Sequence, residues 1–164
     1  MGETVCDAGP LIHLDELGSL DLMEGFAPLL ITETVWHEAT RHRAGLSLAA
    51  APSAVWVRDP QSYDSAMLAL VRSFDLDAGK KTALGLMADR RAELLLCDDS
   101  AARLAAEKLG WTVRGTIGVI VRAIRRGTRT VAQVRALLLE LPERSSLHLS
   151  PALLQRVIAQ LPPA

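Results

Sequence analysis

Hydrophobic and polar positions divide the chain into two kinds of segment. The first kind is a short apolar run that favours a β-strand, found at residues 3–7, 27–32, 54–59, 94–97 and 111–115. The segments between these runs are longer, and their apolar residues recur at the spacing of an amphipathic helix. Because strands that alternate with helices favour a parallel sheet covered on both faces, the pattern predicts an α/β fold.

Residues typical of helix ends mark the helical segments. Thr32, Asp77 and Ser150 are suitable N-caps, and Pro151 fits the first position of the last helix. Gly18 predicts a break within the first segment. The predicted helices cover residues 8–26, 32–42, 62–74, 77–92, 116–127, 130–141 and 151–161, and residues 43–54 are predicted to be a loop or a broken helix. The last helix carries one apolar stripe, made of Leu153, Leu154, Val157, Ile158 and Leu161.

The composition narrows the class of protein. The 164 residues are typical of one domain, and 49% of them are hydrophobic although only 4% are aromatic. A net charge of −1 excludes a global basic field, so a nucleic acid would have to be met by a local patch. Two cysteines are too few for a four-thiolate zinc site, and no apolar run reaches the roughly 18 residues that cross a bilayer. We therefore expect a soluble cytoplasmic protein with Cys6 and Cys97 reduced.

The stretch "AELLLCDDSAARLAAEKLG", residues 92–110, ends an apolar run with two adjacent acids. In one interpretation, Asp98 or Asp99 caps the helix that follows and its neighbour is solvated. In the other, both belong to a functional site, because adjacent carboxylates repel each other and one acid is enough to begin a helix. The pair by itself leaves both interpretations open.

Acids also follow the other predicted strands. Asp7 ends the first strand, and Glu38 lies six residues beyond the second, about 9 Å along the helix that begins there. Because the carboxyl ends of parallel strands meet at one edge of the sheet, these acids converge with Asp98 and Asp99. Mg²⁺ and Mn²⁺ prefer such oxygen ligands. The cluster therefore predicts metal-assisted hydrolysis of a phosphodiester.

The same motifs resemble those of a PIN-like domain. The segments are, in order, "TVCDAGPLIHLDELGSLDLMEGF", "LLITETVWHEA", "LDAGKKTALGLM" and "LLLCDDSAARLAAEKLGWTVRGTIGVIVRA". The resemblance is closest to a bacterial and archaeal branch related to VapC toxin ribonucleases, and it covers residues 3–127. It implies a five-stranded parallel sheet between helices and an acidic Mg²⁺ or Mn²⁺ site that cleaves RNA, often in a dimer held by an antitoxin. We therefore divide the chain into a PIN-like domain, residues 1–130, and a C-terminal helical extension, residues 131–164, packed on the domain or on a partner.

Transferred to this chain, the resemblance assigns the acids individual positions. Asp7 matches the first family acid and Glu38 the second. Asp98 and Asp99 match the late acids, with Asp99 the better candidate for a direct metal ligand. The implied catalytic set is thus these four acids, and the implied metal ligands are Asp7, Asp98 and Asp99.

The chain departs from the family at two positions. Gly9 stands where the family has Ser or Thr, and Lys80 stands where the branch has an acid. A cation in the first turn of a helix opposes the macrodipole and repels a nearby metal. Three alternatives remain open: Lys80 extends into solvent, Asp77 replaces the missing acid, or Lys80 supplies part of the metal's charge and contacts a phosphate.

Lys80 and four further residues are candidates for binding the substrate. Arg103 lies four residues after Asp99, so it can reach back across one helical turn and pair with it. Thr116 is either a hydroxyl donor at the rim of the site or an N-cap. Arg122 and Arg126 belong to a basic stretch that either binds RNA phosphates beside the acids or favours the carbonyl end of a helix.

The histidines carry weaker signals. Glu38 and His42 have a spacing that can hold a metal, but an exposed pair near a helix end is commoner. His13 lies in an apolar segment, where a structural or surface role is favoured. His148 lies in the tail and has no predicted partner.

Two functions from different classes follow. The first is a metal-dependent endoribonuclease that acts on RNA, as a homodimer and as the toxin of a toxin–antitoxin pair with a small antitoxin protein. The second is a degenerate PIN-like module that binds RNA or a partner protein without catalysis, which Lys80 and Gly9 favour. A receiver domain also clusters acids at strand ends, but its acid pair follows the first strand, and here the pair comes late.

Overall fold

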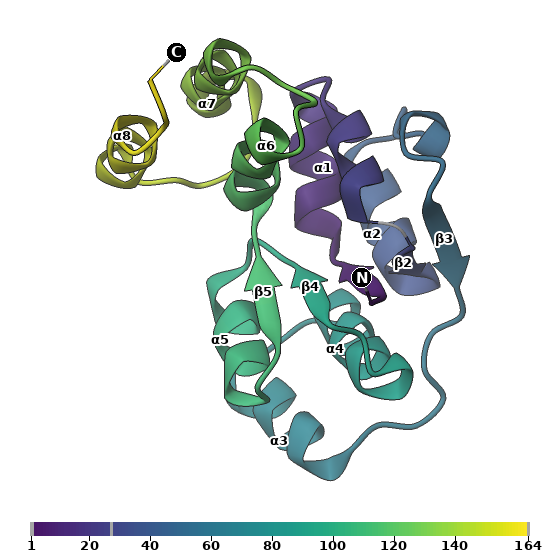
Figure 1. Ribbon diagram of the computed structural model, residues 1–164. Helices are drawn as coiled ribbons and strands as arrows, with labels where there is room; N and C mark the ends of the chain where they lie inside the picture. The colour runs from purple at the N-terminus through teal and green to yellow at the C-terminus, as the bar shows by residue number, and fades with distance from the viewer. Residues whose placement is uncertain (1, 27, 164) are drawn as a thin grey trace.

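The computed structural model describes residues 2–26 and 28–163. Five parallel strands form one sheet in the order β3-β2-β1-β4-β5, which confirms the predicted fold class (Figure 1). Ala27, the first residue of the second predicted strand, lies outside the described residues. The strands are β1 (Thr4–Cys6), β2 (Leu29–Thr32), β3 (Ala54–Val57), β4 (Leu94–Leu96) and β5 (Thr112–Arg114).

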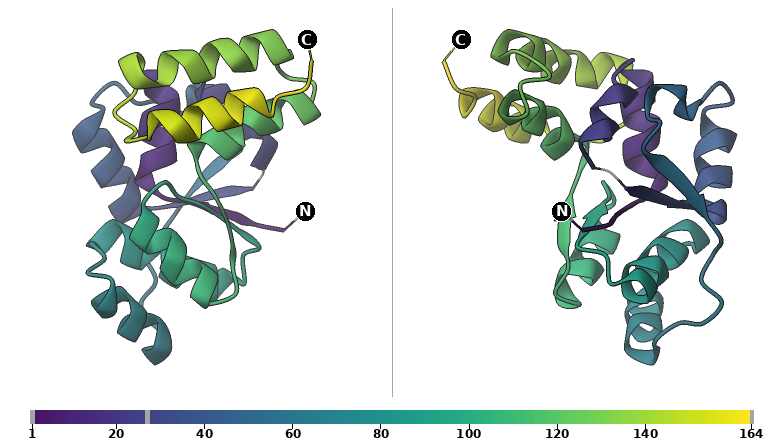
Figure 2. Two further views of the ribbon diagram at one scale, coloured as in Figure 1. Left: turned by 90° about the vertical axis from the view of Figure 1, so that its left-hand side faces the viewer. Right: turned by 45° about the vertical axis from the view of Figure 1, so that its right-hand side comes forward.

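Helices cover both faces of this sheet (Figures 1 and 2). The α-helices are α1 (Ala8–Glu16), α2 (Glu33–His42), α3 (Ser65–Ser73), α4 (Ala78–Arg90), α5 (Ser100–Lys108), α6 (Thr116–Arg125), α7 (Val131–Arg144) and α8 (Pro151–Ala159). Short 3₁₀ helices are η1 (Leu20–Phe26) and η2 (Leu48–Ala50). The helices α1 and α6 lie on one face with α7 and α8 beyond them, whereas α4 and α5 lie on the other with α3 outside them.

The predicted helix caps form as expected. The side chain of Thr32 accepts a hydrogen bond from the backbone of Val35, and Ser150 accepts one from Leu153, with Pro151 at the first helical position. Gly18 adopts a positive φ of 63°, which ends the first helical segment where a residue with a side chain would be strained. Local sequence therefore sets most helix ends.

One helix extends further than its sequence predicts. The pattern predicts a helix over residues 130–141, which ends before Pro142, but α7 continues through Pro142 to Arg144. A proline in the last turn removes only one backbone hydrogen bond. Burial of Leu138 and Leu141 and the ion pair between Arg144 and Glu140 offset that loss.

The core is aliphatic, as the composition predicts. It contains the buried residues of β1, β2 and β4 and small alanines on the inner face of α5. Cys6 and Cys97 are buried free thiols. Buried Val134 on α7 and Leu154 on α8 attach the last two helices to the same core. In the part of the chain that the structure describes, no helix is long and apolar enough to cross a membrane.

Candidate functional site

The predicted catalytic acids line one cavity of about 500 Å³, here called the acidic pocket. Asp7 follows β1, and Asp98 and Asp99 follow β4, the neighbouring strand, where Cys6 pairs with Leu96. The backbone N–H of Asp7 also donates a 2.9 Å hydrogen bond to the carbonyl of Leu96. In this strand order the crossovers change direction between β1 and β4, which is where α/β sheets form their ligand crevices.

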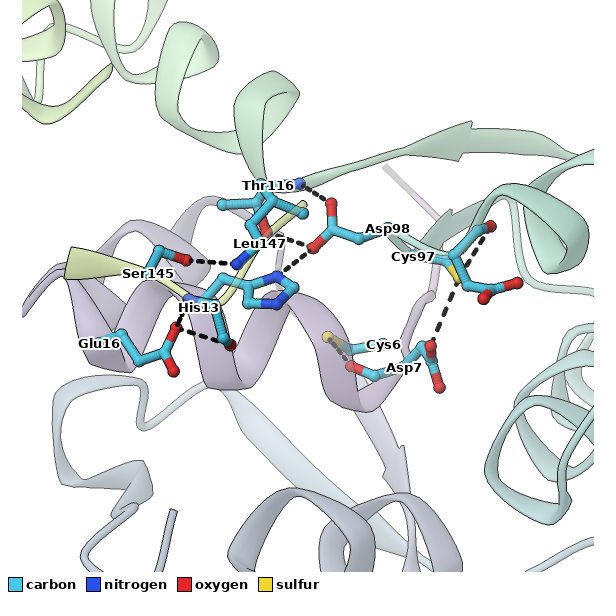
Figure 3. A network of polar contacts seen from close by, with 11 residues as sticks. Cys6, Asp7, His13, Glu16, Cys97, Asp98, Thr116, Ser145 and Leu147 are labelled. Carbon is cyan, nitrogen blue, oxygen red and sulfur yellow. Dashed lines mark hydrogen bonds and ion pairs between the residues drawn. The ribbon is translucent and has the colours of Figure 1, made fainter. Parts of the chain in front are cut away.

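Asp7 is the most buried acid of the pocket and is incompletely satisfied. Only 3% of the residue is exposed, and its Oδ2 accepts a hydrogen bond from the Cys97 thiol at 3.4 Å (Figure 3). Its Oδ1 is buried and has no hydrogen-bond partner among the described residues. Burial raises the pKa of the Asp7 carboxyl above its usual value, although the positive charge of Lys80 acts in the opposite direction.

Asp98 is fully hydrogen-bonded by contrast. Its Oδ1 accepts the backbone N–H of Thr116 at 2.7 Å, and its Oδ2 accepts the Thr116 hydroxyl at 2.5 Å (Figure 3). His13 Nδ1 lies 2.7 Å from the same Oδ2. Asp98 therefore joins the end of β4 to α1 and to the first residue of α6, and neither of its oxygens is free of partners.

The adjacent acids Asp98 and Asp99 thus have different roles. Asp99 is the N-cap of α5, and its Oδ1 accepts the N–H of Ala102 at 2.8 Å. Its second oxygen accepts no hydrogen bond from the residues that the structure describes, and the side chain is exposed at the pocket. One acid does cap the helix, but its neighbour Asp98 is not solvated.

Lys80 points into the acidic pocket and not out to solvent. Its side chain is 14% exposed, and its Nζ lies 2.5 Å from Asp77 Oδ2. Burial acts to lower the pKa of the ammonium, but the hydrogen bond to Asp77 and the charges of Asp7, Asp77 and Glu38 outweigh it and raise that pKa. Lys80 is therefore a permanent cation among these acids.

Asp77 does not replace the acid that the family has at position 80. Its Oδ1 accepts the backbone N–H of Lys80, which caps α4, and its Oδ2 holds the Lys80 ammonium. These hydrogen bonds outweigh the effect of burial and lower the pKa of the Asp77 carboxyl. Both oxygens are thus used within the first turn of α4.

Glu38 reaches the pocket across the beginning of α4. A Cβ placed on Gly79 would lie only 2.1 Å from Glu38 Oε2, so the glycine provides the space for this carboxylate. Burial raises the pKa of Glu38, and the negative charges of Asp7 and Asp77 add to the effect. His42, one turn further along α2, lines the same cavity.

The linker between α7 and α8 forms a wall of the pocket that the sequence did not reveal. Ser146, Leu147 and His148 line the cavity, although they follow Asp7 by about 140 residues. Glu16, at the end of α1, holds the linker in place by accepting the N–H of Ser146 at 2.7 Å and its hydroxyl at 3.1 Å. Burial alone would raise the pKa of Glu16, but the hydrogen bonds from Ser146 outweigh it, and the pKa is lowered. No local pattern marks residues 146–148 as part of a site.

Two predicted substrate-binding residues take unexpected roles. Thr116 is fully buried and donates to Asp98, so it is neither a hydroxyl at the rim nor the cap of α6, which is Gly115. Arg103 forms no ion pair with Asp99 within the described chain, because Asp99 turns toward the N–H of Ala102. Arg103 lines a neighbouring cavity instead.

Arg122 and Arg126 lie away from the acids. A helix that follows a parallel strand runs back toward the amino edge of the sheet, so the last turns of α6 end opposite the acidic pocket. Arg122 donates to the carbonyl of Gly25 at 2.6 Å and stacks on the ring of Phe26. Both arginines line a separate cavity with Asp21 and Gly25. Their binding of RNA stays a prediction, and it would occur at that edge.

The acids of the pocket fit a divalent cation only in part. The described residues contain no group of three His, Cys, Asp or Glu side chains placed to hold an ion. The unpartnered Oδ1 of Asp7 and the second oxygen of Asp99 are nevertheless the two carboxylate oxygens that one ion could use. Mg²⁺ is usually bound through one or two carboxylates, with water and phosphate as the remaining ligands. The pocket therefore offers an ion two carboxylate oxygens, and water or phosphate would have to supply its other ligands.

The sequence was also compared with known proteins. The model of the family DUF3368, described as a PIN domain, matches residues 3–162, which is nearly the whole chain. No curated protein matches the sequence.

Proposed function

Because the chain belongs to this PIN-domain family, whose fold is of the nuclease type, we propose that the acidic pocket is the site of a metal-dependent endoribonuclease. The observation that carries the proposal is the buried Oδ1 of Asp7, which has no partner among the described residues, in a residue that lines one cavity with three further acids. A buried carboxylate without a partner is costly, so its retention at a crevice points to a ligand of positive charge.

The acids of the pocket would have different roles in this reaction. Asp7 and Asp99 would hold Mg²⁺ or Mn²⁺, and Glu38 would orient the water that attacks the phosphodiester. When bound, such an ion lowers the pKa of water and neutralises the charge that develops on phosphate. Asp98, whose oxygens are both engaged, keeps α1 and α6 in position around the ligands and is the least available of the four acids for coordination.

Lys80 gives this pocket a second positive charge that does not depend on a metal. Its ammonium is held by Asp77 and lies in the cavity with Asp7 and Glu38. An ammonium donates hydrogen bonds to phosphate oxygens and can take over part of the neutralisation that a second ion would supply. The proposal is therefore a site with one metal ion and one lysine.

The biological setting of this activity is also a proposal. The resemblance to VapC-related ribonucleases favours a toxin of the cytoplasm, bound by a small antitoxin and active as a homodimer. The C-terminal extension, residues 131–164, would then contribute to such contacts as well as to the pocket wall. Leu139 is an exposed leucine on α7 that favours a partner surface on this extension.

A second candidate function is supported by the same lysine. A PIN-like module that binds RNA or a protein without cleaving it needs a cation in the pocket but no metal. The ion pair between Lys80 and Asp77 already supplies that charge, and the donor set for an ion is small. Metal binding therefore distinguishes the two functions.

The deciding experiment is titration calorimetry of the wild type with Mn²⁺ and Mg²⁺, with Asp7→Asn and Lys80→Glu in parallel. Binding by the wild type that Asp7→Asn removes supports the ribonuclease, and cleavage of single-stranded RNA is then measured. If the wild type binds no metal and Lys80→Glu does, the ribonuclease proposal is wrong for this chain and the binding module replaces it.

A further inference from the structure

A second cavity of about 400 Å³ continues the acidic pocket on the side of α8. The two cavities share four lining residues, namely Asp98, Ser100, Leu147 and His148. We call the second cavity the arginine cleft and define it by Arg103, Arg114, Leu149, Leu153 and Val157 together with the shared residues. Its volume lies in the range of small-molecule sites. A polymeric ligand held in the acidic pocket can therefore continue directly into the cleft.

The cleft contains guanidinium groups that lack an acidic partner. In the part of the chain that the structure covers, the guanidinium of Arg103 forms no ion pair or hydrogen bond, and that of Arg114 donates only to the carbonyl of its neighbour Val113, at 3.1 Å. A Cβ on Gly115 would lie 2.7 Å from Arg103 Nη1, so the glycine lets the guanidinium lie against the backbone beside Asp98. Arginines in such a state bind phosphate, often with two parallel hydrogen bonds.

The opposite wall of the cleft is apolar. It consists of Leu147, Leu149, Leu153 and Val157, from the linker and from α8, and Leu153 is 40% exposed. In the left view of Figure 2, α8 lies above α5, the helix that carries Arg103. A ligand that fits both walls has an anionic part and a flat apolar part, which is the description of a nucleotide.

The apolar wall is fixed before any ligand arrives. Glu16 accepts two hydrogen bonds from Ser146, and the hydroxyl of Ser145 accepts the N–H of Leu147 at 3.1 Å (Figure 3). Leu154 is buried and anchors α8 to the core one residue after the exposed Leu153. A preformed wall lowers the entropic cost of binding.

We propose that the arginine cleft binds one nucleotide of single-stranded RNA, next to the phosphate that the acidic pocket holds. Arg103 and Arg114 bind the phosphate of this nucleotide, and its base lies on the leucines of the linker and α8. The proposal rests on the proposed function, because it places the RNA relative to the acids. The base contacts are apolar, so the cleft discriminates weakly between base sequences.

The test measures RNA binding without cleavage. A fluorescein-labelled single-stranded RNA of eight nucleotides is titrated with the full-length protein in EDTA, and fluorescence anisotropy gives the Kd. Arg103→Ala removes one guanidinium, and Arg156→Ala, at an exposed position of α8 outside the cleft, is its control of equal charge. Leu153→Asp places a charge on the apolar wall, and Val55→Asp, at an exposed position of β3 outside the cleft, is its control of equal charge.

The proposal predicts a selective loss of binding. Arg103→Ala weakens binding about tenfold and Leu153→Asp several-fold, whereas the two controls bind as the wild type does. Equal Kd values for Arg103→Ala, Leu153→Asp and the wild type overturn the cleft as a nucleotide site, as does a wild type that binds no RNA. Equal weakening by all four variants overturns it as well, because the effect is then one of net charge. Calorimetry with metal decides the proposed function separately, since it involves no RNA.

Discussion

The carboxylates on the two sides of the acidic pocket differ in how well they are hydrogen-bonded. On the β4 side, Asp98 receives three hydrogen bonds, from Thr116 and His13. On the β1 side, Asp7 is more deeply buried, keeps one oxygen without a partner in the described residues, and is balanced mainly by the charge of Lys80. One acid of the pocket is thus used for structure, and another is held at a cost in stability. Such a cost is typical of groups retained for binding or chemistry.

The largest predicted effect is a loss of stability when Asp98 is replaced. Replacing Asp98 by Ala leaves the hydroxyl and N–H of Thr116 and the ring of His13 without their acceptor, so we expect the free energy of unfolding to fall by about 3 kcal/mol. Urea unfolding measures the difference. Asp98→Asn keeps one acceptor oxygen and should lose less. A loss below about 1 kcal/mol for Asp98→Ala would contradict the assignment of Asp98 as an anchor.

The next prediction is a gain in stability when Asp7 is replaced. Asp7→Asn removes a buried charge whose pKa is raised, so the variant should be more stable than the wild type by about 2 kcal/mol at pH 7 in EDTA. The raised pKa means that the folded protein binds this proton more tightly than the unfolded chain does. The penalty on the wild type is therefore absent at low pH and develops as the pH rises from the ordinary value of an aspartate to the raised value. Thermal unfolding between pH 3 and 8 follows this divergence, and parallel curves would refute it.

A third prediction concerns Lys80, the cation of the pocket. Lys80→Met removes the cation that faces Asp7, Glu38 and Asp77, so we expect the protein to lose about 1 kcal/mol at pH 7. In the Asp7→Asn background the loss should be smaller, because one of the three charges is already gone. A double-mutant cycle by urea unfolding gives the coupling, and additive effects would show that Lys80 does not act on Asp7.

The smallest effect separates capping from ligand binding at Asp99. Asp99→Ala removes the N-cap of α5 and should cost about 1 kcal/mol, whereas Asp99→Asn retains a capping oxygen and should cost almost nothing. Mn²⁺ calorimetry on Asp99→Asn then tests the carboxylate alone. Unchanged metal affinity in this stable variant would remove Asp99 from the proposed ligands.

The fold was predictable because its signals are local. Alternating strands and helices, the caps Thr32, Asp77 and Ser150 and the motifs of the PIN family all lie in short segments, and the family match confirms the resemblance. The meeting of the acids at one edge follows from the same pattern, since parallel strands place their carboxyl ends together.

The roles of the individual acids were not predictable, because distant residues decide them. Asp98 differs from Asp99 through His13, 85 positions earlier, and through Thr116, 18 positions later. The linker wall depends on a contact between Glu16 and Ser146, which are 130 positions apart. Arg122 lies far from the acids because α6 runs back toward the amino edge of the sheet. Its position could therefore be predicted from the sheet topology.

The pair of tryptophans on α2 and β3 has a further consequence. Trp36 on α2 and Trp56 on β3 have ring centroids 5.2 Å apart, and Trp56 is 54% exposed. Trp36 precedes Glu38 by two residues, so a shift of α2 on ligand binding would change the environment of this pair. Trp111, the remaining tryptophan of the sequence, lies just before β5 and gives a background signal. The intrinsic fluorescence of the unlabelled protein is therefore an optical readout of the second acid's helix, suited to stopped-flow measurement of ligand entry.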